Sequence, residues 1–234
     1  MIGGGTHMDA WSGRRVSAAL AMAGGLLALV GNALAPRFNG DDVANYQKIA
    51  DSTRYAVAGV IVLAAVLLVS AAFAGINRFG LGEVRTEISY FASFAVSAGA
   101  AIAVLQTGVA LYGYKQQARA FDGANAQNVV SAFWATNALD HLSSAMFAAW
   151  TIVLLGLAPA LIGAAQLRAG VHGRLGLGGV TGGAVCLVVG VASLLTVDQS
   201  TYDVPFVVGS VIVTIWLIVT GVLLWRLPRQ QITA

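Results

Sequence analysis

The chain has 234 residues, of which 58% are hydrophobic and 10% are charged, and its formal net charge is +3. Soluble domains carry about 25% charged residues, so this composition excludes a soluble globular enzyme and a disordered chain. The single cysteine excludes an intrachain disulfide. These values are typical of a polytopic membrane protein.

Six uncharged runs are long enough to cross a membrane, because a helix needs about 20 apolar residues to span a hydrocarbon core of about 30 Å. The sequence therefore predicts an all-α fold, a single transmembrane bundle of six helices over residues 16–227. The tails are predicted at residues 1–15 and 228–234. The spans are predicted at about residues 16–36, 55–77, 88–114, 143–167, 175–197 and 204–226.

The segment between the first two spans predicts a short amphipathic helix. Asn39-Gly40 is a turn signal, and Asp41 is a suitable helix N-cap. The apolar residues that follow share one helical face: Val43, Tyr46, Ile49 and Ala50. This helix is expected either to lie on the membrane surface or to act as a lid over a cavity.

Residues 123–167 are too many for one crossing, because a single helix of that length would extend about 67 Å. Either a long helix projects out of the membrane, or a short outer helix precedes a bend. Asp140 argues for the second alternative, since a carboxylate at the bilayer centre costs about 2.5–3.5 kcal/mol on insertion scales. We therefore predict an outer helix at residues 126–142 and a crossing at residues 143–167, while one long helix over residues 123–167 stays open. Pro159, which lacks a backbone N–H, is expected to distort that crossing.

The distribution of lysine and arginine predicts the orientation, since these residues favour the cytoplasmic side. Eight lie on the side of the termini: Arg14, Arg15, Arg78, Arg85, Arg168, Arg174, Arg226 and Arg229. Five lie on the other side: Arg37, Lys48, Arg54, Lys115 and Arg119. This predicts a multi-pass protein of the bacterial plasma membrane with both termini in the cytoplasm.

The fifth span is rich in glycine and contains two GxxxG pairs, Gly178/Gly182 and Gly179/Gly183. Small residues let helix backbones approach closely in lipid. Two uses of these glycines stay open: packing inside the bundle, or contact with a second copy or another membrane protein. Membrane lipids are the other expected partners, together with an apolar small molecule. The basic residues are too scattered to predict binding to nucleic acid.

Candidate binding residues gather at the predicted outer side. Trp134, Asn137 and His141 share a helical stripe, and Asp140 lies about 100° around the helix from His141. Inside the spans, two uncharged polar residues are candidates for interhelical hydrogen bonds or for a transport path. The full predicted set is Trp134, Asn137, Asp140, His141, Tyr46, Asn32 and Gln106.

The remaining motifs predict no cofactor, no metal and no catalytic residue. The three histidines fall on different sides of the membrane, which disfavours a three-histidine zinc site. The sequence contains no HExxH, no GxxxxGK and no GxSxG motif.

Two segments resemble a known family. They are Gly31-Asn32-Ala33-Leu34-Ala35-Pro36-Arg37 with the acidic loop after it, and Gly221-Val222-Leu223-Leu224-Trp225-Arg226. These segments are similar to the DUF4386-like family, small uncharacterised multi-pass proteins of actinobacteria and some archaea. The resemblance implies a compact helical bundle in the plasma membrane and implies no activity.

The sequence favours a non-enzymatic membrane protein that binds a lipid, an apolar ligand or a partner helix near the outer leaflet. The first alternative is a transporter or channel for small solutes or ions, which needs a polar path at the bilayer midplane. The second alternative is an intramembrane enzyme with His141 as general base.

Overall fold

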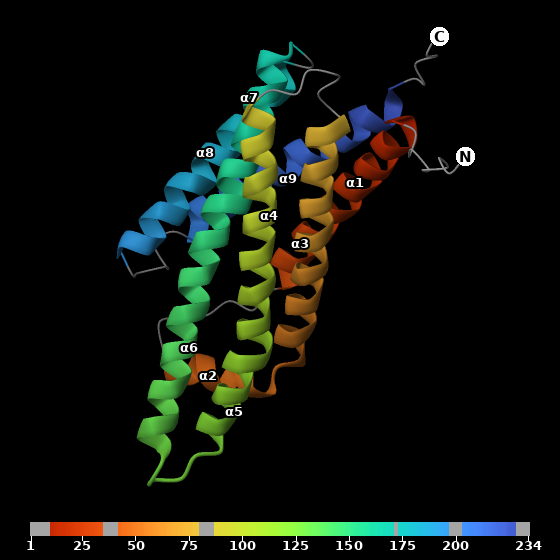
Figure 1. The fold of residues 1–234 in the computed structure, drawn as a ribbon. Helices are drawn as coiled ribbons and strands as arrows, with labels where there is room; N and C mark the ends of the chain where they lie inside the picture. The colour runs from red at the N-terminus through yellow and green to blue at the C-terminus, as the bar shows by residue number, and fades with distance from the viewer. Residues whose placement is uncertain (1–9, 35–41, 80–86, 171–172, 197–202, 228–234) are drawn as a thin grey trace, which may run out of the picture.

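The computed structural model describes residues 10–34, 42–79, 87–170, 173–196 and 203–227, and every element within them is a helix (Figure 1). Six helical runs in this part of the chain are long and apolar enough to cross a bilayer. They are Trp11–Leu34, Thr53–Phe79, Glu87–Asp122, Val129–Arg168, Arg174–Thr196 and Val204–Arg226. The predicted all-α polytopic bundle is confirmed.

The elements follow one another in a simple order along the chain. They are α1 (Ala10–Leu34), α2 (Asp42–Asp51), α3 (Thr53–Phe79), α4 (Glu87–Gly108), the π-helix η1 (Val109–Tyr114), α5 (Lys115–Asp122), α6 (Val129–Trp150), the π-helix η2 (Thr151–Leu157), α7 (Ala158–Arg168), α8 (Gly173–Thr196) and α9 (Asp203–Arg226). The predicted short helix between the first two spans is α2, while its proposed cap, Asp41, lies outside the described residues.

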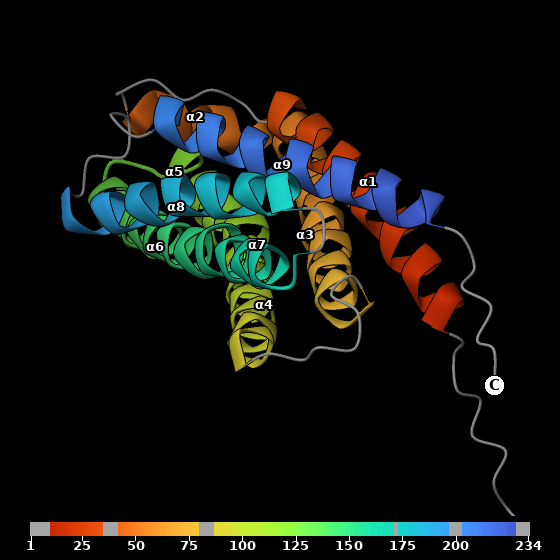
Figure 2. The same cartoon turned by 90° about the horizontal axis from the view of Figure 1, so that it is seen from above.

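The bundle has two distinct ends (Figure 1). At one, which we call the terminal end, α1 begins and α9 finishes. At the other, the α2 end, lie α2, α5 and the start of α6. Seen from above, α8 and α9 run side by side and are inclined to α3 and α4 (Figure 2). Helix α1 packs against α3 and α9, and α8 packs against α7, η2 and α9.

Helix α1 begins at Ala10, ahead of the predicted start of the first span. The Arg15 guanidinium lies 4.1 Å from the Trp11 ring centroid and 5.0 Å from that of Trp225. Cations are attracted to the faces of indole rings. The contact therefore joins the first turns of α1 to the last turn of α9.

Two helical runs are longer than a membrane crossing requires. The run from α4 to α5 has 36 residues and the run from α6 to α7 has 40, which correspond to about 54 Å and 60 Å of helix. Of the two alternatives for residues 123–167, the structure shows the long helix: α6 continues from Val129 to Trp150 without interruption, within a run that reaches Arg168. The irregular part of the run from α6 to α7 is the π-helix η2, which ends two residues before Pro159. Proline supplies no N–H and its ring crowds the carbonyl four residues earlier, which favours a widened turn there.

The buried side chains form two separate cores. The larger contains residues of α1, α3, α4, the α6–α7 run, α8 and α9, with Phe73, Leu154 and Trp216 among them. The second lies at the α2 end and is built from α2, η1 and α5: Tyr46, Ile49, Ala50, Tyr114, Ala118 and Phe121. Helix α2 is therefore an integral part of the protein.

The glycines of α8 allow close approach to two neighbouring helices. A Cβ on Gly183 would lie 2.5 Å from the Gly156 carbonyl oxygen of η2, and Gly179 faces α7. Gly178 and Gly182 instead face α9. All four glycines of the two GxxxG pairs are thus in contact within the chain, as the packing alternative describes.

The Gly183 contact is testable by substitution. We expect Gly183→Ala to lower the free energy of unfolding by about 1–3 kcal/mol, because the new methyl group meets rigid backbone atoms. The fully buried Cys186 thiol reports unfolding through its reaction with a maleimide during a thermal ramp. Gly108→Ala is the control, since no atom lies within 4 Å of its Cβ position. Equal unfolding midpoints for the two variants would contradict this packing.

Candidate functional site

Two cations hold the C-terminal end of α2. The Lys115 Nζ donates to the Ser52 carbonyl oxygen at 2.8 Å, and the Arg119 Nε donates to the Ala50 carbonyl oxygen at 2.9 Å. Lys115 and Arg119 are four residues apart on α5 and therefore share a face. The last carbonyls of a helix lack intrahelical partners and carry partial negative charge. These hydrogen bonds therefore fix α2 against α5.

Tyr46 is the centre of the α2-end core and is only 1% exposed. Its hydroxyl donates to Asn137 Oδ1 on α6 at 3.1 Å. Its ring makes edge contacts with Tyr114 and Phe121, with centroid separations of 5.9 and 5.8 Å. Burial, together with the negative charges of Asp140 and Asp42, raises the pKa of Tyr46 to about 12. The phenol therefore stays protonated and continues to donate at physiological pH.

The π-helix η1 shapes the opposite side of this core. The Tyr55 hydroxyl of α3 donates to the Ala110 carbonyl oxygen of η1 at 3.3 Å. The same π-helix turns Tyr114 inward, where it is buried against Tyr46. Single π-turns within α-helices are frequent at functional sites. Here the widened turn positions an aromatic side chain beside α2.

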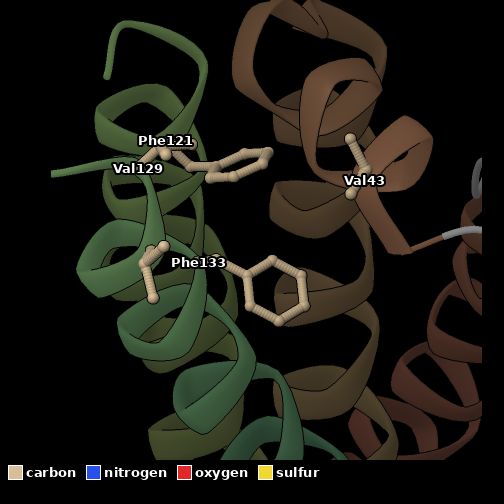
Figure 3. A pocket seen from close by; sticks show the side chains of 5 residues that line it. Val43, Phe121, Val129 and Phe133 are labelled. Carbon is tan, nitrogen blue, oxygen red and sulfur yellow. The ribbon is translucent and has the colours of Figure 1, made fainter. Parts of the chain in front are cut away.

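A groove opens between α2 and the corner where α5 meets α6 (Figure 3). Its volume is about 260 Å³, and its lining residues are all apolar: Val43, Phe121, Val129, Val130 and Phe133. Figure 3 shows Val43 on α2 across the gap from Phe121 and Phe133. The groove is wide open on one side, so it offers one apolar face to part of a hydrocarbon chain.

The structure brings several predicted site residues to this end. Asn137 is bonded to Tyr46, and the half-buried Asp140 lies close enough to act electrostatically on Tyr46. Trp134 is 62% exposed and packs edge-on against Phe133 with centroids 5.6 Å apart. His141 is exposed.

The two predicted polar residues of the spans lie apart from each other. Gln106 Nε2 donates to Ser143 Oγ at 3.0 Å and so joins α4 to α6. Asn32 is exposed near the end of α1, a helix that packs against α3 and α9. None of the seven predicted residues lines the groove.

The groove itself was not predicted from the sequence. Val43 was assigned to the buried face of the short helix, yet it is 43% exposed because it borders the groove. The amphipathic pattern of α5, with Phe121 among polar residues, was the one signal for a second buried surface here.

Comparisons of the chain with models of protein families, with curated proteins and with solved structures found no match. The function is therefore argued from the geometry of the α2 end.

The Tyr46 phenol gives a test based on pH. Its folded pKa of about 12 exceeds the ordinary value of about 10, so its contribution to stability is complete below pH 10 and is lost as the pH rises through 12. We expect Tyr46→Phe to destabilise by about 1 kcal/mol at neutral pH and to reduce the loss of stability between pH 10 and 12. Thermal unfolding at several pH values measures this. The exposed Tyr112→Phe is the control, and an identical effect there would refute the assignment.

The attachment of α2 by Lys115 is tested by hydrogen exchange. Lys115→Met removes the charged donor to the Ser52 carbonyl, which directly follows α2. Hydrogen bonds to charged groups contribute about 1.5–3 kcal/mol, so the amides of α2 are expected to exchange at least about tenfold faster. Lys48→Met, on the exposed face of α2, should leave exchange unchanged. If α2 exchanges at the wild-type rate in Lys115→Met, the attachment does not depend on this cation.

Proposed function

We propose that this chain is a membrane-embedded binding protein that holds the hydrocarbon chain of an amphiphile in the groove at the α2 end. One observation carries the proposal: a groove of about 260 Å³ lined only by apolar side chains. Ligand pockets are predominantly apolar concavities, and an amphiphile within the membrane has its hydrocarbon chain available for such a site.

The walls of the groove are held in place, which supports a binding role. Helix α2 is fixed at its C-terminal end by Lys115 and Arg119. On the other side, the ring of Phe121 packs against Phe133 with centroids 6.0 Å apart, and both pack against Tyr46. A preformed site loses less conformational entropy on binding than one that must first be ordered.

The chemistry of the groove favours binding over catalysis. Its five lining side chains carry no acid, base or nucleophile, and these are the groups on which enzymatic proton transfer and covalent catalysis depend. The alternative of an intramembrane enzyme relied on His141, which is exposed and does not line the groove.

The expected place of the groove is the outer leaflet of the plasma membrane. The positive charges near the chain termini put the terminal end in the cytoplasm by the usual charge rule, and the α2 end is opposite to it. In this orientation, the α2 end faces the outside, where the groove is at the outer surface of the bundle.

Blocking the groove tests the proposal. Val130 is 66% exposed at the groove, so Val130→Trp fills the cavity without overpacking a core. We expect wild-type protein in nanodiscs to retain an uncharged dodecyl glucoside in native mass spectrometry, and Val130→Trp to bind it at least about tenfold more weakly.

The matched control is Val60→Trp, because Val60 is 59% exposed on α3 and does not line the groove. This variant should bind as the wild type does, and all three proteins should unfold at similar temperatures. Equal retention by Val130→Trp and wild type, or no retention by wild type, would overturn the proposal.

A further inference from the structure

We propose that the terminal end binds the phosphate of an anionic phospholipid head group where the first turns of α1 meet the last turns of α3 and α9. We call this place the helix junction. It lies at the opposite end of the bundle from the groove, so the inference does not depend on the proposed function. It is drawn from three arginines that the contacts of these helices bring together: Arg14, Arg15 and Arg78.

The packing of α1 places Arg14 between the two other helices of the junction. Helix α1 begins at the terminal end, where α3 and α9 finish (Figure 1). Ser17 of α1 packs against Gly75 of α3, and the Ala18 carbonyl oxygen lies 2.9 Å from the Cβ position of Gly221 on α9. Arg14 precedes these two residues of α1 by one turn and shares their face. Its side chain therefore leaves α1 between α3 and α9.

Aromatic rings hold the other two arginines on either side. The Arg15 guanidinium lies 5.0 Å from the ring centroid of Trp225 on α9. The Arg78 guanidinium lies 5.3 Å from the Phe79 ring centroid on α3, and the edge of that ring packs against Gly13 of α1. Cation–π contacts of this kind restrict a long side chain. Less conformational entropy is then lost when a ligand binds.

The protein itself supplies no anion to these cations in the part that the structure describes. Arg14 Nε is buried without a hydrogen-bond partner there. Among the described residues of the three helix ends, 10–18, 72–79 and 218–227, there is no aspartate or glutamate. A buried charged donor without an acceptor is costly. A phosphate beside the guanidinium lowers this cost, and arginine binds phosphate with well-defined geometry.

The charge of the whole sequence favours a head group with a net negative charge. Eight arginines are assigned to the side of the termini, against three carboxylates: Asp9, Glu83 and Glu87. These carboxylates offset fewer than half of the arginines, so the surplus differs from the nearly balanced charges of the α2 end. A zwitterionic head group would bring an ammonium charge to the same arginines, which an anionic head group does not.

The depth of the junction identifies the source of the phosphate as a lipid. Arg15 is the last charge before the uncharged run of α1, and Arg78 and Arg226 are the first charges after those of α3 and α9. Such positions mark the boundary of the membrane. Beside them, Val16 is 49% exposed and Leu26 is 57% exposed on α1. A lipid can thus place its phosphate at the arginines and its chains along α1.

The test compares two lipids with identical chains, phosphatidylglycerol and phosphatidylcholine, each titrated onto the detergent-solubilised protein and counted by native mass spectrometry. We expect phosphatidylglycerol to bind at least about fivefold more tightly at low salt, and the preference to diminish at high salt. Glycerol phosphate, which lacks the chains, should not displace the lipid at equal concentration. Displacement would indicate a site for a soluble anion and would overturn the assignment to a lipid.

Variants assign the preference to the helix junction. The double variant Arg14→Gln with Arg15→Gln should bind both lipids with similar affinity. Arg78→Gln leaves the contact of Arg15 with Trp225 in place and should also reduce the preference. Reaction of the buried Cys186 thiol with a maleimide checks that each variant is folded, and Arg78→Gln decides the question if the double variant is not.

The matched control is Arg168→Gln, which removes the same charge from the same side of the protein. Arg168 is exposed at the end of α7, a helix that packs against α4 and α8. This variant should retain the preference for phosphatidylglycerol. An equal loss in Arg168→Gln would show that the preference follows total charge, and a full preference in folded Arg78→Gln and in the double variant would show that the junction is not the site. Either result would overturn the inference.

The groove variant separates this inference from the proposed function. Val130→Trp fills the groove at the α2 end and should bind phosphatidylglycerol as the wild type does. Loss of the preference in this variant would place the lipid in the groove and refute the junction. Failure of the wild type to retain dodecyl glucoside would refute the proposed function and leave the junction unaffected.

Discussion

The candidate site depends on how α2, a helix too short to cross a membrane, is held against the ends of two helical runs that are too long for one crossing. Ten residues correspond to about 15 Å of helix, and an isolated helix of this length is marginal in water. Its stability must therefore come from contacts with α5 and α6. Burial of Tyr46 and Ile49 supplies the apolar part. Arg119 satisfies the Ala50 carbonyl near the end of α2, and Lys115 holds the Ser52 carbonyl that directly follows it.

The two long runs provide the surface for those contacts. The helix from α4 to α5 and the one from α6 to α7 each exceed the thickness of a hydrocarbon core, so part of each is available beyond a crossing. The half-buried Asp140 lies at the α2 end of the longer run, where its negative charge acts on Tyr46. The excess helix length is thus what allows a second, aromatic core to form apart from the main one.

The sequence predicted those features that depend on composition and helical period. Six uncharged runs identified six spans, because length and hydropathy are sufficient for that purpose. The burial of Tyr46, Ile49 and Ala50 followed from their spacing. The sequence left open whether residues 123–167 form one helix or two, because hydropathy locates the membrane boundary of a helix and does not indicate where the helix ends. The π-helices and the groove were missed because they depend on how distant segments pack, such as α2 with Val43 opposite Phe133 of α6, which no local pattern encodes.

Counting lysine and arginine residues did not show what these side chains do in the structure. Lys115 and Arg119 entered the sequence argument only as charges that set orientation, whereas in the structure they complete the C-terminus of α2. The apolar groove lies at the same contact, because Phe121, two residues after Arg119 on α5, packs its ring against Tyr46 and lines the groove. The contact between α2 and α5 thus both holds the end of α2 and shapes the groove.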